Sequence, residues 1–124
     1  MGKQILLVGF GGFIGSVARH FLSGAITKWF PTSFPIGTFI VNVAGCLFIG
    51  IIYGIASRFG WMTQEWKLFL ATGICGGFTT FSAFAYEGFR LIETSEYWTF
   101  ASYALLSLIF CVLAVFFGIS LSKL

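Results

Sequence analysis

Composition and the spacing of apolar residues together predict an all-α integral membrane protein with four transmembrane helices. Of the 124 residues, 58% are hydrophobic and 9% are charged, and the mean hydropathy is +0.97. A soluble globule of this size needs far more charged surface. The apolar residues fall into four stretches, each near the roughly 20 residues that a helix needs to cross a hydrocarbon core about 30 Å thick. The turns between them leave no room for a soluble domain, so residues 1–124 form a single transmembrane domain.

The first predicted span covers about residues 4–26 and has a face of small residues. Gly11 and Gly15 form a GxxxG pattern, which lets the backbones of two helices approach closely. The same span carries Arg19, which is costly near hydrocarbon and must snorkel outward, find a partner or face water. Two hypotheses remain for Arg19: snorkelling to the interface, or a functional role at an aqueous entrance.

The second predicted span covers about residues 36–57 and contains a second GxxxG pattern, Gly50 and Gly54. It also contains Asn42, whose amide offers two N–H donors and one carbonyl acceptor. Burying that amide without partners would cost roughly 4 to 8 kcal/mol. Asn42 therefore either makes an interhelical hydrogen bond, which is common for membrane asparagines, or supplies a donor to a pathway through the protein.

The third predicted span, about residues 67–92, is predicted to be broken near its middle. Its residues of weak helix propensity are three glycines followed by two threonines: Gly73, Gly76, Gly77, Thr79 and Thr80. A break in mid-membrane frees backbone groups that need partners from protein, water or an ion. Discontinuous spans of this kind often mark ion sites.

A stripe of aromatic rings follows this break, with Phe78, Phe81 and Phe84 three residues apart. Such stripes are typical of packing, but here the hydroxyls of Thr79, Thr80 and Ser82 lie among the rings. An aromatic ring has a negative face and a positive edge, so rings met edge-on can solvate a small anion. Dehydrating an anion costs tens of kcal/mol in the Born limit. Several donors must therefore replace its water together, and Thr80 and Ser82 are candidates beside the rings.

Further along the same span, Glu87 and Arg90 are one helical turn apart. This spacing permits an ion pair, which is one hypothesis for Glu87. The other is a gating or access role at the mouth of a pathway, because an unpaired carboxylate within an anion path would repel the anion.

The fourth predicted span covers about residues 98–121 and carries a polar ladder on an otherwise apolar helix. Tyr103, Ser107 and Cys111 recur every four residues and therefore share one face. Their OH and SH groups either bond to their own or a neighbouring helix or provide a path for an anion.

The cysteines and the basic residues do not indicate a metal site, a disulfide or a nucleic-acid partner. Cys46, Cys75 and Cys111 are odd in number, lie in apolar stretches and show no CxxC or Cys/His spacing, so each is interpreted as a small buried hydrophobic residue. The seven basic residues are scattered singly, without a stripe or cluster.

The basic residues also show almost no bias between the two sides of the membrane. Four lie on the side of the N-terminus and three on the other: Lys3, Arg58, Lys67 and Lys123 against Arg19, Lys28 and Arg90. Orientation normally follows an excess of Lys and Arg in cytoplasmic loops. The near balance predicts insertion in both orientations and an antiparallel homodimer with a two-fold axis in the membrane plane. A single, weakly biased orientation is the alternative.

Three strings carry a resemblance to a known family: GGFIGSVARH in the first span, GTFIVNVAGCLFIG in the second and GICGGFTTFSAFAYEGF in the third. In this order and in so short a chain, they resemble the Fluc (CrcB) fluoride channels of microbes over essentially the whole length. The resemblance implies a dual-topology antiparallel homodimer with two pores, each built from both subunits. These pores would pass fluoride passively out of the cytoplasm across the bacterial inner membrane.

The resemblance also implies roles for individual residues. The implied pore residues are two rings, the pore asparagine and the polar track of the fourth helix: Phe81, Phe84, Asn42, Tyr103, Ser107 and Cys111. Arg19 and Glu87 match positions near the aqueous vestibules. A structural sodium ion on the dimer axis would be held by the backbone carbonyls of Gly76 and Thr79. The chain departs from many relatives in having Ala83 in place of Thr and Phe78 in place of Leu.

Three other functions fit the sequence less well than a channel. A proton-coupled drug transporter of the small four-helix kind would need a carboxylate in its first span, and this chain has none there. A non-transporting subunit of a larger membrane complex is compatible with the composition. An enzyme is the poorest fit, because no Ser/His/Asp, paired-carboxylate or metal constellation is present.

Overall fold

The computed structural model describes residues 1–124 as helices joined by short turns, without strands. The helices are α1 Gly2–Trp29, α2 Ile36–Arg58, α3 Gln64–Lys67, the π-helix η1 Leu68–Cys75, α4 Gly76–Phe78, α5 Phe81–Glu93 and α6 Tyr97–Leu121. Four segments are long and apolar enough to cross a bilayer, the third being α3 to α5 together. The prediction of an all-α, four-span membrane protein with a broken third span is therefore confirmed, with span ends a few residues wider.

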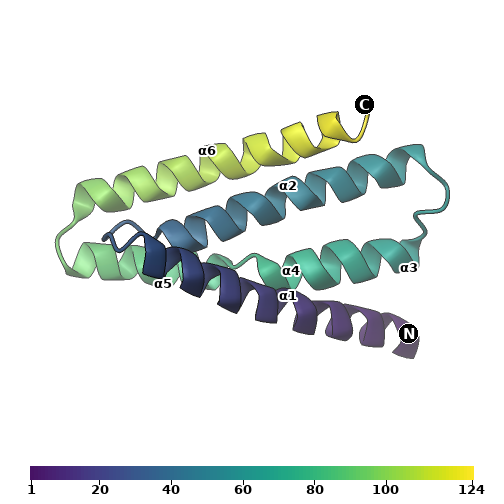
Figure 1. Cartoon of the computed structure of the whole chain (residues 1–124), viewed down its shortest axis with the longest axis horizontal. Helices are drawn as coiled ribbons and strands as arrows, with labels where there is room; N and C mark the ends of the chain where they lie inside the picture. The colour runs from purple at the N-terminus through teal and green to yellow at the C-terminus, as the bar shows by residue number, and fades with distance from the viewer.

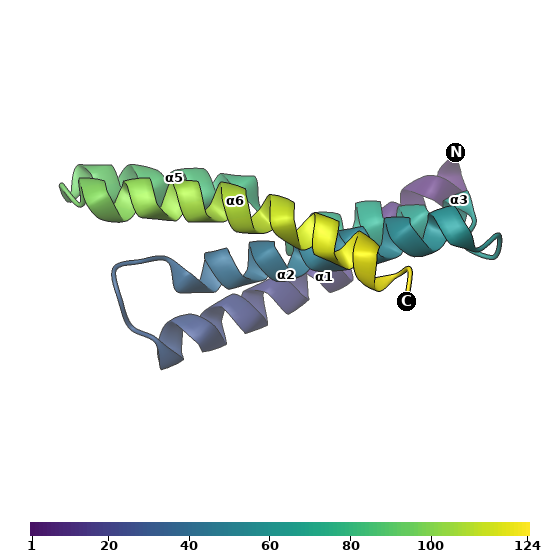
Figure 2. The same ribbon diagram turned by 90° about the horizontal axis from the view of Figure 1, so that it is seen from above.

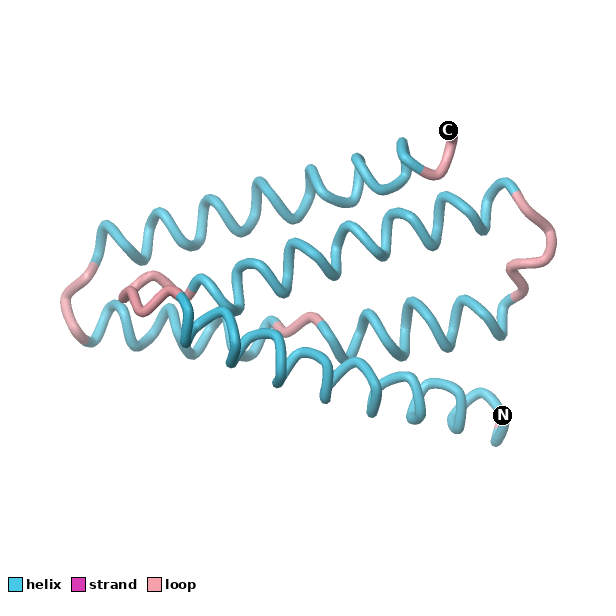
Figure 3. Tube along the Cα trace, viewed as in Figure 1, coloured by secondary structure: helices cyan, strands magenta, loops and turns pink.

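The four spans run back and forth along one long axis (Figure 1). The trace is helical almost throughout, and the short loop in the middle of the third span stands out in Figure 3. Seen from above, the α5 and α6 pair separates from the α1 and α2 pair toward one end of the molecule (Figure 2). At the other end, which carries the C-terminus, α6 stays close to α2.

Glycines set the closest helix contacts, as the GxxxG patterns predict. A Cβ on Gly15 of α1 would collide with the carbonyl oxygen of Ile74 in η1, and a Cβ on Gly50 of α2 would collide with that of Val115 in α6. The backbones of α2 and α6 also meet at Gly118. These contacts are backbone against backbone, so no side-chain rotation could relieve a larger residue.

The break in the third span lies at two threonines and not at the glycines that precede them. Thr79 and Thr80 are extended, with φ/ψ of −84°/155° and −149°/115°, whereas Gly73 lies in η1 and Gly76 and Gly77 in α4. Tertiary packing keeps the glycines helical, because α1 lies against the backbones of Gly73 and Gly77. The β-branched threonines, which favour extended backbone, take the break instead.

Candidate functional site: a polar cavity beside the broken span

Asn42 of α2 supports the break in the third span directly. Its Nδ2 donates to the carbonyl oxygen of Thr80 at 3.1 Å, and its Oδ1 accepts from the N–H of Thr80 at 2.8 Å. One side chain thus satisfies both backbone groups of a residue that has left the helix. The hypothesis of an interhelical hydrogen bond holds for Asn42. Its Nδ2 also carries a second N–H, which the bonds to Thr80 do not use.

The threonine hydroxyls complete the local hydrogen bonding. Thr79 Oγ1 donates to the carbonyl of Cys75 at 2.9 Å. Thr80 Oγ1 accepts from the N–H of Ala83 at 3.1 Å and so caps the start of α5. Ser82 Oγ lies 3.2 Å from Thr80 Oγ1. The hydroxyls of this segment are therefore held in fixed positions next to the break.

Two carbonyl groups lose their usual helical donors through these bonds. In a continuous α-helix, Gly76 O would accept from the N–H of Thr80, and Thr79 O from the N–H of Ala83. Those two N–H groups are directed to Asn42 and to the Thr80 hydroxyl instead. Freed backbone carbonyls in mid-membrane need another partner.

Arg19 of α1 reaches the same region. Its Nε donates to the carbonyl oxygen of Gly77 at 3.2 Å. Gly77 lies in the last helical turn before the break. Arg19 also borders a shallow hollow with His20, Ser23 and Lys28. The guanidinium therefore joins the first span to the broken one while remaining next to open space.

A cavity of about 320 Å³ lies between α2, the break, α5 and α6. It is lined by Asn42, Cys46, Ile49, Thr79, Thr80, Phe81, Phe84, Ala104, Ser107, Leu108 and Cys111. Six of the eight predicted pore residues are in this set; Ser82 and Tyr103 are the two that are not. Tyr103 lies next to it, because its ring centroid is 5.0 Å from that of Phe84.

The aromatic stripe divides between packing and the cavity. Phe78 does not line the cavity and lies against Gly45 of α2. Phe81 and Phe84 both line it, with ring centroids 5.5 Å apart. Phe81 is 78% exposed, so its own chain covers little of its ring.

The polar ladder of α6 provides the one unsatisfied buried side-chain atom of the structure. Tyr103 is buried, and its OH donates to Glu87 Oε1 at 3.2 Å. Ser107 Oγ is also buried and has no hydrogen-bond partner. Leaving a buried hydroxyl unpaired costs about 1 to 3 kcal/mol. Ser107 also lines the cavity, so the cavity is bordered by a hydroxyl that has no partner within the chain.

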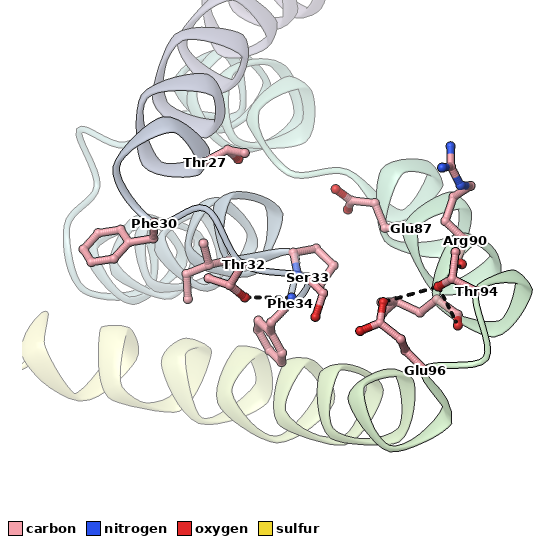
Figure 4. A pocket seen from close by; sticks show the side chains of 12 residues that line it. Thr27, Phe30, Thr32, Ser33, Phe34, Glu87, Arg90, Thr94 and Glu96 are labelled. Atoms are coloured by element: carbon pink, nitrogen blue, oxygen red, sulfur yellow. Dashed lines mark hydrogen bonds between the residues drawn. The ribbon is translucent and has the colours of Figure 1, made fainter.

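Glu87 does not form the ion pair with Arg90 that its spacing permits. Arg90 Nε pairs with Glu93 Oε1 at 3.6 Å. The Glu87 carboxylate points into a second cavity of about 300 Å³, away from the Arg90 guanidinium (Figure 4). This cavity lies at the splayed end, among the 30–36 loop, α5 and Glu96. We call this second cavity the mouth. Glu87 bonds to Tyr103, whose ring packs on Phe84 of the first cavity, so these residues lie between the mouth and the cavity at the break.

Cys46 and Phe34 are among the residues of this region that sequence reasoning did not assign to the site. Cys46 lines the cavity one turn after Asn42, and the helical spacing alone could have placed it there. Phe34 packs edge-on against Tyr103 with centroids 5.3 Å apart. Phe34 lies in a turn, where no periodic pattern indicates a contact.

Comparison with known proteins gives one family over nearly the whole chain. Residues 6–119 match the model of the CrcB-like protein, Camphor Resistance (CrcB) family. A relative from Azobacteroides pseudotrichonymphae, named fluoride-specific ion channel FluC, is 43% identical over 99% of this chain and 98% of its own. Proteins of the same name from Leptospira interrogans (40% identity, 98% of this chain and 95% of the relative) and Chlorobium phaeobacteroides (43%, 97% and 93%) match similarly. With the motifs, the four spans and these matches in agreement, the chain belongs to the CrcB family.

Proposed function

We propose that this protein is a fluoride-selective channel that exports fluoride passively from the cytoplasm across the bacterial inner membrane. The observation that carries the proposal is the cavity beside the break. It brings the rings of Phe81 and Phe84 together with the Asn42 amide and the unpartnered Ser107 hydroxyl. The relatives' names, fluoride-specific ion channel, support the same substrate. The protein is thus a transport protein and not an enzyme.

The physical basis is replacement of fluoride's hydration shell by many modest donors. Ring edges of Phe81 and Phe84 present positive potential, and the amide and hydroxyl groups add hydrogen bonds. Each contact is weak enough to permit release, which conduction requires. A larger anion such as chloride gains less from each contact and fits a narrow aromatic bore poorly. Thr80 and Cys111 belong to the same lining, and Ser82 and Tyr103, which do not line the cavity, are proposed to extend it along the bore.

A second copy of the chain completes the pore in this proposal. Phe81 is 78% exposed at mid-membrane, and its cavity opens on one side of the single chain. The nearly balanced basic residues favour insertion in both orientations. An antiparallel two-fold dimer would cover Phe81 and produce two equivalent pores, each lined by both subunits.

A structural sodium ion at the centre of this dimer fits the residues present. Na⁺ is a hard cation that takes oxygen ligands, and the carbonyl oxygens of Gly76 and Thr79 have lost their helical donors to Asn42 and Thr80. Two copies of the chain would present two such pairs. When bound, the cation supplies positive charge that offsets repulsion between anions in the two pores. A lower melting temperature in N-methylglucamine than in Na⁺ buffer would support this; equal values would refute it.

The decisive experiment is fluoride efflux from liposomes that contain only this protein, followed with a fluoride electrode. Rapid fluoride efflux with retained chloride is expected. Efflux that requires a proton gradient would indicate the transporter alternative, and no efflux from correctly folded protein would indicate a non-transporting subunit. Arg19 and Glu87, next to open space at the break and in the mouth, are proposed to act in the vestibules.

A further inference from the structure

Two thiols line the cavity that the proposed function uses. Cys46 comes from α2 and Cys111 from α6; both are free and only partly buried. The third thiol, Cys75, is buried in η1 and does not line the cavity. The cavity thus contains a pair of soft sulfur groups that take part in none of the hydrogen bonds at the break.

Helical register and glycine packing place these thiols opposite each other. Cys46 lies one turn after Asn42 and one turn before Gly50 on α2, and Cys111 lies one turn after Ser107 on α6. The backbones of α2 and α6 meet at Gly50 and Gly118, just beyond the thiols. Both thiols line the cavity across this tight seam. They cannot move far apart unless the helices separate.

The ligand set selects one class of metal ion. No group of three or more His, Cys, Asp or Glu side chains gathers anywhere in the structure, which disfavours Zn²⁺ with its four tetrahedral ligands. Hard cations require oxygen ligands. Thiolates select soft cations, and soft d¹⁰ ions such as Hg²⁺, Ag⁺ and Cu⁺ are satisfied by two sulfurs in a line.

The binding step also suits a low-dielectric cavity. When Hg²⁺ binds, the S–H bonds of Cys46 and Cys111 break, two S–Hg bonds form, and two protons leave to water without any change of oxidation state. The bis-thiolate product is neutral for Hg²⁺, whereas Ag⁺ and Cu⁺ reach neutrality with one thiolate and one thiol. Burial of such a neutral complex therefore avoids the large cost of placing a net charge in an apolar medium.

We propose that Cys46 and Cys111 form a two-coordinate site for a soft d¹⁰ cation and that the bound cation blocks the pore. The binding part of this proposal stands on the thiol pair, while the block rests on the proposed function. The cation would lie in the same cavity as Phe81, Phe84 and Ser107, in the path assigned to the anion.

The test measures fluoride efflux from liposomes with and without Hg²⁺, each variant being compared with its own mercury-free rate. The unmodified protein and Cys75→Ser should lose most of their efflux. Cys46→Ser and Cys111→Ser should both retain it, because either change leaves a single sulfur in the cavity. Zn²⁺ at the same concentration should leave efflux unchanged. Undiminished mercury block in Cys46→Ser, or equal block by Zn²⁺, would overturn the proposal.

A binding measurement separates the site from the channel. In the Cys75→Ser protein in detergent, the ultraviolet absorption of mercury thiolate should saturate at one Hg²⁺ per chain, and adding Cys46→Ser should remove the tight binding. Tight binding without fluoride efflux would uphold the thiol site and refute the channel. Normal efflux with no tight binding would do the reverse.

Discussion

Phe81 and Phe84 differ from Phe78 in what their rings contact, and this difference predicts separate mutant phenotypes. Phe81→Ile removes one polarised ring edge from the cavity, and Phe84→Ile removes the other. Either substitution should abolish fluoride efflux while the dimer survives. The matched control is Phe78→Leu, which alters a ring packed on Gly45 and should keep efflux. Efflux and size-exclusion profiles of the three variants provide the measurement. Unchanged efflux in both Ile variants would mean that all three rings only pack.

Ser107 allows stability and transport to be separated, because its buried hydroxyl has no partner. Ser107→Ala removes a group whose desolvation costs about 1 to 3 kcal/mol, so thermal stability should rise or stay level while fluoride efflux falls. Ser107→Thr keeps the hydroxyl and should keep most of the efflux. Ser120→Ala is the control, since that hydroxyl bonds to Phe116 of its own helix. A parallel loss of stability and efflux in Ser107→Ala would argue for a purely structural serine.

At the scale of elements, α1 holds the broken span in place through its glycine face. Gly15→Ala would drive a Cβ into the carbonyl of Ile74, and overpacking of this kind costs about 1 to 3 kcal/mol. We expect a lower melting temperature in detergent and weaker efflux, because the neighbouring break would shift. Gly24→Ala in the same helix meets no atom within 4 Å and should be neutral or slightly stabilising. Equal melting temperatures for the two variants would contradict this account of the packing.

At the scale of the whole molecule, the count of four basic residues against three predicts insertion in both orientations. A single cysteine added next to Lys123, in a chain with Cys46, Cys75 and Cys111 replaced, should react with impermeant reagents from both faces of the membrane. Adding lysines to the 30–35 turn should bias the labelling to one face, because positive loops stay cytoplasmic. Labelling from one face alone in the unbiased chain would exclude the antiparallel dimer.

The sequence by itself determined what depends on local composition and period. The four spans followed from hydropathy, the close helix contacts from GxxxG spacing, and the existence of a break from the weak helix propensity of residues 73–80. Polar residues and ring stripes in apolar stretches gave candidates, the family resemblance gave them pore roles, and most of these residues line one cavity. Each of these features depends on neighbouring residues or on the residues of one helical face.

Only the tertiary structure decided which polar groups of distant residues form hydrogen bonds with one another. Packing of α1 on Gly73 and Gly77 moved the break to Thr79 and Thr80, and Asn42 took the N–H that frees the Gly76 carbonyl. Glu87 bonds to Tyr103 and not to Arg90, and Arg19 to Gly77. Cys46 entered the cavity opposite Cys111. Which partner a polar group takes depends on which side chains meet across helices. Hydrogen bonds between residues far apart in the chain produce no periodic pattern in the sequence.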